Sequence, residues 1–133
     1  MNPNLKGTIG ELAVTQDLLH KGFYVFAEVT KHSKVDLVAM SSDYGRSYKV
    51  QVKTVVSKND QVYVDVRKSC LNKKYNSFYT VGQNDYYAVY IIDQNKVFYI
   101  PEELFLSVTS GLTFSLKESE KLRCIKDYNG PLA

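Results

Sequence analysis

One aspartate, Asp36, stands inside the otherwise apolar run Val35–Ala39. Burying a carboxylate there is costly unless the group is paired or binds a cation, and strands disfavour aspartate. In the later run Tyr48–Lys53, valines alternate with polar residues, so Gln51 and Lys53 share one face of a strand. A hairpin that joins the two runs would bring two oxygen ligands and one ammonium group to that face. Lys53 alone is more often a solvated strand lysine, but beside two oxygen ligands it favours a catalytic role.

A third oxygen ligand lies on a helix, which the apolar spacing predicts over Asn4–Lys21 with Gly22 as its C-terminal stop. Glu11 falls at the edge of the apolar stripe of this helix. Packing of the helix on the sheet could direct Glu11 toward Asp36. Taken alone, Glu11 is more often a solvated helix carboxylate.

Two glycines, Gly7 and Gly10, lie inside the predicted helix. Each costs about 1 kcal/mol relative to alanine in a helix interior. We therefore expect another backbone, of protein or DNA, to approach the helix closely at these positions. A frayed first turn is the alternative explanation for Gly7.

The remaining elements are predicted to be mostly strands. Four strand-like runs follow the helix, namely Phe23–Val29, Lys34–Met40, Tyr48–Val56 and Gln61–Val66. Their short, turn-rich links favour an antiparallel meander. The pattern continues with a hairpin formed by Tyr86–Ile92 and Lys96–Ile100 and with a helix that starts at Pro101. Two short strands are possible near Leu112–Leu116 and near Leu122–Ile125. This order predicts an α+β fold, with a mixed central sheet flanked by helices, in a single domain of residues 1–133.

Composition excludes several other classes of protein. With 44% hydrophobic and 23% charged residues, the chain lies in the globular range. No run approaches the roughly 20 apolar residues of a membrane span, and the N-terminus is polar rather than a hydrophobic signal region. Cys70 and Cys124 have no metal-binding spacing and are expected to be reduced thiols. We therefore expect a cytoplasmic protein that does not enter a membrane.

The net charge of +3 says little by itself, but the positive charge is concentrated. No acidic residue falls between Val66 and Asp85, whereas four basic residues do, Arg67, Lys68, Lys73 and Lys74. Such a patch can neutralise phosphates of a nucleic acid, or it can be an ordinary solvated loop.

Three segments together carry a family resemblance. In chain order they are Gly10-Glu11 on the first helix, Val35-Asp36-Leu37-Val38-Ala39, and Val50-Gln51-Val52-Lys53. Their order and spacing resemble the PD-(D/E)XK nuclease superfamily, especially the archaeal Holliday junction resolvases and a small group that includes an intron-encoded homing endonuclease. The motifs cover about residues 6–54, and a looser similarity continues through Tyr86–Pro101. The resemblance implies a catalytic core over about residues 6–66, with DNA-binding and oligomerisation elements in residues 67–133.

Two residues depart from the superfamily pattern. Val35 precedes the acid where the family name has proline, which mainly affects the entry to the strand. Gln51 stands where most members have aspartate or glutamate, so the site has less negative charge for a cation. Glutamine does occur here in the group with the homing enzyme, which favours that group. It also leaves open an inactive descendant that only binds DNA.

The resemblance implies hydrolysis of phosphodiester bonds by a metal-activated water, with Glu11, Asp36, Gln51 and Lys53 as the catalytic residues. Asp36, the side-chain oxygen of Gln51 and the carbonyl of Val52 would hold Mg²⁺ or Mn²⁺. Lys53 would orient the attacking water and stabilise the transition state. Glu11 would position a second metal ion or a water.

The expected partner is double-stranded DNA. Phosphate contacts near the site are expected from Lys31, His32 and Lys34, and weaker candidates elsewhere are Lys117, Lys121 and Arg123. Cutting both strands needs two active sites, so we expect a homo-oligomer, either a dimer or a dimer of dimers, with Tyr86–Ile92 as a possible interface. The sequence thus predicts a site-specific double-strand endonuclease of the homing type. A junction-resolving nuclease, a restriction endonuclease and an inactive DNA-binding module remain alternatives.

Overall fold

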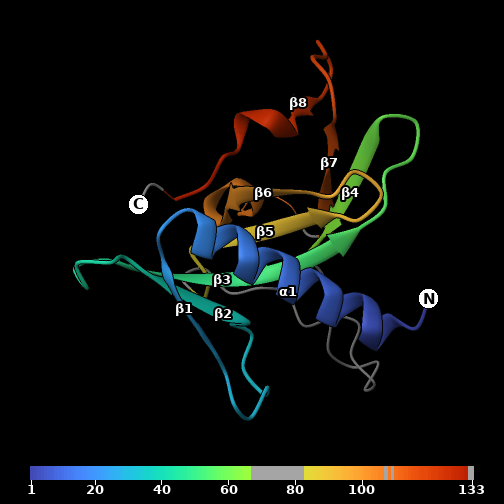
Figure 1. Cartoon of the computed structure of the whole chain (residues 1–133). Coiled ribbons are helices and arrows are strands. Elements are labelled where there is room, and N and C mark those ends of the chain that lie inside the picture. Colours follow the sequence, from blue (N-terminus) through green and yellow to red (C-terminus); the bar gives the residue numbers. More distant parts are fainter. Residues whose placement is uncertain (67–82, 107, 109, 132–133) are drawn as a thin grey trace.

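The computed structural model describes residues 1–66, 83–106, 108 and 110–131. This part of the chain forms three layers, with one α-helix on one face of a five-stranded sheet and a three-stranded sheet on the other (Figure 1). The predicted α+β class with a mixed sheet is confirmed. Within the described ranges, the smaller sheet rather than a second α-helix covers the second face. No described helix is both long and apolar enough to cross a membrane.

The helix α1 (Pro3–His20) matches the prediction to within one residue at each end. It begins where the Asn2 side chain accepts a hydrogen bond from the Asn4 N–H at 2.8 Å, which satisfies one of the unpaired donors of the first turn. It ends before Gly22, whose φ of +91° is a conformation that glycine adopts without steric cost. Val14 and Leu18 are fully buried against the five-stranded sheet.

The five-stranded sheet has the order β1-β2-β3-β5-β6. Its strands are β1 (Tyr24–Ala27), β2 (Leu37–Met40), β3 (Ser47–Val55), β5 (Tyr86–Ile91) and β6 (Lys96–Pro101). The predicted antiparallel pairing is confirmed for β1, β2 and β3 and for the β5–β6 hairpin. The meander also predicted that the fourth run, Gln61–Val66, pairs with β3. This prediction is wrong, because β3 pairs in parallel with β5 instead.

The fourth strand, β4 (Gln61–Asp65), leaves that sheet and pairs with β7 (Gly111–Ser115), which in turn pairs with β8 (Arg123–Cys124). Its alternating burial explains why, since Val62 and Val64 point into a core shared by both sheets while their neighbours are exposed. The expected helix after Pro101 is only a 3₁₀ turn, η1 (Glu102–Phe105), and a second such turn, η2 (Ile125–Asp127), follows β8. Cys124 is a free thiol, and Cys70 lies outside the described residues.

Strand β5 is buried on both faces. Tyr87, Val89 and Ile91 pack toward the smaller sheet, and Ala88 and Tyr90 pack toward α1. A strand covered on both faces is apolar almost without interruption, which is the pattern of this run. The expectation that Tyr86–Ile92 offers an apolar face to another subunit is therefore wrong.

A close approach to the helix occurs at one of the two glycines, although not by the backbone that was expected. A Cβ atom at Gly10 would lie 1.8 Å from Thr54 Oγ1 and 3.3 Å from a methyl carbon of Val52, both on β3. The neighbours are thus side chains of the sheet rather than a backbone. At Gly7 nothing in the described chain lies within 4 Å of the same position, so the expected approach of a protein backbone is wrong there. The approach of DNA stays a prediction.

Candidate active site

Asp36 is the last residue before β2, and its carboxylate lies beside β3, on the side of that strand that faces β2. The Asp36 N–H donates to the carbonyl of Val50 at 3.0 Å, although Val50 is paired in register with Leu37. Two residues thus face one, as in a β-bulge, which redirects a side chain at the end of a ladder. Asp36 Oδ2 then accepts a hydrogen bond from the Val52 N–H at 2.8 Å. The N–H and C=O groups of one strand residue point to the same side of the strand, so the Val52 carbonyl also points to the side on which Asp36 lies.

Glu11 and Asp36 line one cleft of about 410 Å³ between α1 and the segment that leads into β2. Its wall also contains Thr8, Leu12, Thr15, Ala27, Glu28, Lys31, Ser33, Val35 and Leu37. Burial raises the pKa of Glu11 above its ordinary value, and the negative charge of Asp36 raises it further, whereas the positive charge of Lys31 opposes both effects. The structure therefore brings two of the predicted acids together with one of the predicted basic residues.

A turn over residues 28–33, organised by Glu28, places Lys31 in the wall of the cleft. The Glu28 carboxylate accepts bonds from the hydroxyls of Thr30 (2.6 Å) and Ser33 (2.7 Å) and from the N–H groups of His32 (3.0 Å) and Ser33 (3.0 Å). These bonds, the Thr30 and Ser33 hydroxyls first, lower the pKa of Glu28 to about 2. Sequence reasoning missed Glu28, although a carboxylate closely followed by two hydroxyl residues was a usable signal.

Gln51 and Lys53 lie on the opposite face of β3 from Val52 and Thr54, which pack under the helix at Gly10. Lys53 is half-buried there, and Gln51 is only 7% exposed. Gln51 Oε1 accepts a bond from Asn84 Nδ2 at 3.4 Å. The sequence predicted one shared face for Asp36, Gln51 and Lys53, whereas the bulge directs Asp36 along the edge of the strand. Sequence reasoning missed Asn84, because nothing in its local pattern distinguishes it from a loop residue.

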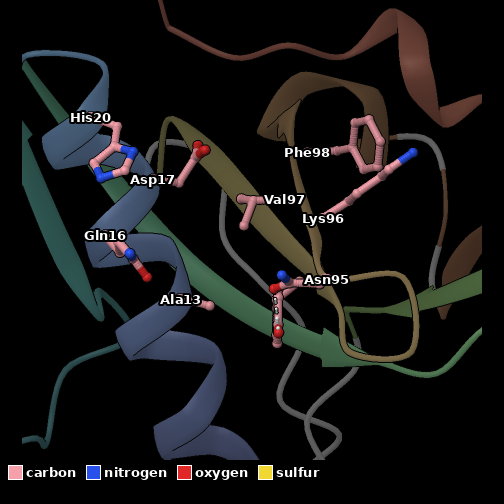
Figure 2. Close-up of a pocket in the computed structure, with 9 residues that line it drawn as sticks. Ala13, Gln16, Asp17, His20, Asn95, Lys96, Val97 and Phe98 are labelled. Atoms are coloured by element: carbon pink, nitrogen blue, oxygen red, sulfur yellow. Dashed lines mark hydrogen bonds between the residues drawn. The ribbon is translucent and has the colours of Figure 1, made fainter.

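Figure 2 shows a second cleft, of about 420 Å³, between α1 and the β5–β6 hairpin. Three of its polar side chains already hold the fold together. Asp17 Oδ2 accepts a bond from the Tyr99 hydroxyl at 2.6 Å, and the Tyr90 hydroxyl donates to Asn95 Oδ1 at 2.9 Å. Burial and the bond to Asp17 raise the pKa of Tyr99. Since this cleft lacks a pair of acids, the cleft with Glu11 and Asp36 is the better candidate for chemistry.

Comparison with known proteins identifies the family of the chain. A family model described as PD-(D/E)XK endonuclease matches residues 1–129, nearly the whole chain. The chain belongs to the PD-(D/E)XK endonuclease family. Among solved structures, it is similar to a bacterial homing endonuclease, I-Ssp6803I, with a TM-score of 0.74 and 26% identity over 91% of this chain and 82% of that chain. No curated protein matches the chain significantly.

The basic residues of this PD-(D/E)XK endonuclease are placed unequally around the cleft. Lys31 lines it, His32 is tied to Glu28 through its N–H, and the main chain of Lys34 contacts Asn84. The four residues of the predicted basic patch, Arg67, Lys68, Lys73 and Lys74, lie outside the described residues. The weaker candidates follow β7 on the far side of the molecule, where Lys117 pairs with Asp60 at 3.3 Å and Lys121 and Arg123 are exposed.

The oxygen donors around Asp36 fit a hard divalent cation. Three carboxylates line the cleft, those of Glu11, Glu28 and Asp36, and carboxylate oxygens are the ligands that a hard cation prefers. Glu28 is already bonded to Thr30, His32 and Ser33, which leaves Glu11 and Asp36, with the Val52 carbonyl on the same side of β3 as Asp36. In the described part of the chain, no group of three or more His, Cys, Asp or Glu side chains is arranged so that it could hold a metal ion. A cation held here would need neutral oxygens as well. The Val52 carbonyl lies on the Asp36 side of β3, whereas Gln51 does not line this cleft.

Proposed function

We propose that this endonuclease uses a divalent cation, Mg²⁺ or Mn²⁺, to make site-specific double-strand breaks in DNA, as an enzyme of the homing type. The observation that carries the proposal is the anchoring of Asp36 on the Val52 N–H, in the cleft that also holds Glu11. The similarity to a solved bacterial homing endonuclease over 82% of that chain supports the type.

The family resemblance gives each predicted catalytic residue a role, although Gln51 and Lys53 lie on the face of β3 that is turned away from Glu11. Asp36, the Val52 carbonyl and Gln51 Oε1 would hold the cation, which when bound lowers the pKa of a water and neutralises charge on the phosphate. The Lys53 ammonium orients that water and stabilises the negative charge that develops on the phosphate oxygens. Glu11 positions a second water or a second ion from the helix side of the cleft.

Double-stranded DNA would approach through its phosphates. We assign the nearest contacts to Lys31, His32 and Lys34, and further contacts to the patch of Arg67, Lys68, Lys73 and Lys74. Because these contacts release counterions, the affinity should fall steeply as salt rises. The two strands of a duplex need two active sites, so at least two copies of the chain would act together.

A second candidate function is a DNA-binding module without nuclease activity. The observation that favours it is Gln51, a neutral amide that is 7% exposed at a position where a charged ligand would bind a cation more tightly. The comparison of binding with cutting separates the two functions.

The test is selection of cleaved sequences from a degenerate duplex library in Mg²⁺ and in Mn²⁺. We expect the wild-type chain to cut a defined sequence. Lys53→Ala should lose about 10²-fold or more of the cleavage rate while it still binds that duplex. The control is Lys58→Ala, which removes an exposed lysine at the β3–β4 turn.

Three outcomes would contradict parts of the proposal. A Lys53→Ala variant that still cuts at the wild-type rate would overturn the role of Lys53. A wild-type chain that binds DNA but never cuts it would favour the inactive module. Cutting of a four-way junction, with linear duplexes left intact, would favour a junction-resolving nuclease.

A further inference from the structure

Asn84 is a buried polar side chain that contacts both β3 and the segment that leads into β2. It is only 3% exposed. Its Nδ2 donates to Gln51 Oε1 at 3.4 Å and to the Lys34 carbonyl at 3.1 Å, and its main-chain N–H donates to Glu102 Oε2 at 2.7 Å. No hydrogen-bond donor among the described residues reaches its Oδ1. An amide buried with an unsatisfied oxygen is costly, so its presence calls for an explanation.

The two bonds of Nδ2 connect the parts of the chain that carry the site. Gln51 lies on β3, and Lys34 lies two residues before Asp36, in the segment that leads into β2. The Asn84 side chain therefore bridges Gln51 to the segment that carries the aspartate.

These contacts also settle which atom of each amide points where. A backbone carbonyl only accepts hydrogen bonds, so the Asn84 atom that faces Lys34 must be the nitrogen. That nitrogen only donates, so the Gln51 atom that faces Asn84 must be the oxygen. A carbonyl oxygen has two lone pairs, and one of them stays available to Gln51 Oε1. At 3.4 Å the contact is long for a hydrogen bond and is therefore a weak one. Its influence on Gln51 comes from the donor character of Asn84 Nδ2, which favours an oxygen rather than an NH₂ group as its neighbour.

This orientation matters more for glutamine than for an acid. A carboxylate presents an oxygen whichever way it is turned, whereas a flipped amide presents an NH₂ group, which repels a cation. Only one of the two orientations of the Gln51 amide offers an oxygen, so a neighbour that fixes this orientation determines whether Gln51 can bind a cation.

We propose that Asn84 is a positioning residue, which keeps the carbonyl oxygen of Gln51 as the atom offered to the cation. This inference rests on the proposed function, because it assumes that Gln51 is a ligand. It explains why a polar side chain is buried at this point and which neighbour makes a neutral residue usable in place of an acid.

The test compares two substitutions of Asn84, each in two backgrounds. Asn84→Asp keeps the size of the side chain and removes the donor, so Gln51 is expected to turn its own NH₂ group toward the new carboxylate. Asn84→Ala removes the side chain, and both variants keep the main-chain bond to Glu102. In the Gln51→Glu background the orientation of residue 51 no longer matters, so Asn84→Ala should have little effect there.

The first readout is Mg²⁺ affinity, measured by calorimetry on the full chain without DNA. Loss of a partner that orients a metal ligand weakens binding by about 10- to 100-fold, and we expect that loss for Asn84→Asp and Asn84→Ala with Gln51 in place. With Gln51→Glu, the loss for Asn84→Ala should be less than about 3-fold. The second readout is the side-chain carbonyl ¹³C resonance of Gln51, which should shift on addition of Mg²⁺ in the wild type and not in Asn84→Asp.

Two controls keep the result interpretable. Asn95→Asp introduces the same charge at a residue of the second cleft, where Asn95 Oδ1 accepts from Tyr90 and an aspartate would also accept. Thermal melting of each variant shows whether it folds, and the ¹³C readout on Asn84→Asp remains usable if Asn84→Ala does not.

The outcomes separate the inference from the function on which it rests. A wild-type chain that neither binds Mg²⁺ nor cuts DNA would overturn both. If the wild type binds and cuts, and Asn84→Asp binds equally well with an unchanged ¹³C shift, only the role of Asn84 is overturned. Equal losses of affinity for Asn84→Ala in both backgrounds would also overturn it, because they would mark Asn84 as a packing residue.

Discussion

At the scale of residues, Glu11 and Asp36 share a cleft although their charges repel. Groups with perturbed pKa values in a cleft are candidates for function, because folding alone gains nothing from placing them there. Lys31 reduces the repulsion, since its charge lowers the pKa of Glu11. A divalent cation would reduce it further, so the same arrangement that costs stability in the free protein favours binding of a metal ion.

This cost can be measured as thermal stability. The pKa of Glu11 is raised in the folded state above its ordinary value of 4.5, so its contribution to stability is present below pH 4.5 and is lost as the pH rises through the raised value. At pH 7 without divalent metal, we expect Glu11→Gln to melt at a temperature slightly above that of the wild type, by roughly 1–2 °C because the group is partly solvated. The difference should vanish near pH 4. Glu120→Gln, at an exposed position, is the control, and a lower melting temperature for Glu11→Gln at pH 7 would contradict the argument.

The causes of the shift can also be separated. Asp36→Asn removes one of them, so the pKa of Glu11 should fall toward its ordinary value but stay above it, because burial remains the largest cause. Lys31→Ala removes the opposing charge and should raise the pKa of Glu11. Titration of the Glu11 side-chain carboxyl by ¹³C NMR measures both shifts. Shifts of the same sign in the two variants would show that Lys31 does not act on Glu11 through its charge.

The sequence singled out Asp36 and Glu11 as candidate site residues, but it did not indicate the residues that surround the predicted site. An acid inside Val35–Ala39 is visible because strand burial makes it costly, and Glu11 is visible at the edge of a helical stripe. Asn84, for example, contacts Gln51 from 33 positions further along the chain, through one side-chain amide. Spacing within one element carries no information about such a contact, so the sequence alone could not reveal it.

At the scale of elements, the approach of α1 to β3 sets the position of Glu11. Gly10 directly precedes Glu11, and its missing Cβ leaves room for Thr54. Gly7, one turn earlier on the same helix, faces open space. The two glycines therefore form a matched pair for testing this contact.

Alanine at the two positions should act in opposite directions. Gly7→Ala improves helix propensity with no clash and should stabilise the protein by about 0.5–1 kcal/mol. Gly10→Ala places a methyl group 1.8 Å from Thr54 Oγ1, and such overpacking should cost about 1–3 kcal/mol and lower the cleavage rate by moving Glu11. Urea denaturation followed by circular dichroism measures both changes. Adding Thr54→Ala should recover part of the loss in Gly10→Ala, and an absence of any loss would show that the helix does not need this close contact.

Element boundaries were largely readable from the sequence, whereas one pairing partner was not. The helix and the strands of the β5–β6 hairpin match their predicted bounds to within one residue, because local periodicity determines them. The parallel pairing of Val50 with Tyr86 joins segments that are distant in the chain. Short links suggested a meander, but the burial of Val62 and Val64 in the core between the sheets takes β4 away from β3.

At the scale of the whole molecule, the five-stranded sheet is held between two cores. One core lies under α1, and the other joins the two sheets through β4, β5, β6 and β7. Gln51 and Lys53 lie on the side of the second core, whereas Glu11 belongs to the helix on the first side. The candidate site therefore depends on both cores, and the smaller sheet contributes to the support of the strand that carries two of its residues.

This dependence predicts that the smaller sheet does not unfold separately. Phe114 is fully buried between the sheets and contacts the rings of Phe105 and Tyr128. Replacing a buried phenylalanine with alanine costs about 3–5 kcal/mol, a large part of the roughly 5–15 kcal/mol that stabilises a typical domain. We expect Phe114→Ala to lower the midpoint of a single urea transition, followed both by circular dichroism and by hydrogen exchange at amides of β4 and β5. Tyr63→Ala, on the exposed face of β4, should cost about 1 kcal/mol or less. If β4 amides in Phe114→Ala exchange freely while those of β5 keep wild-type protection, the smaller sheet is dispensable for the larger one.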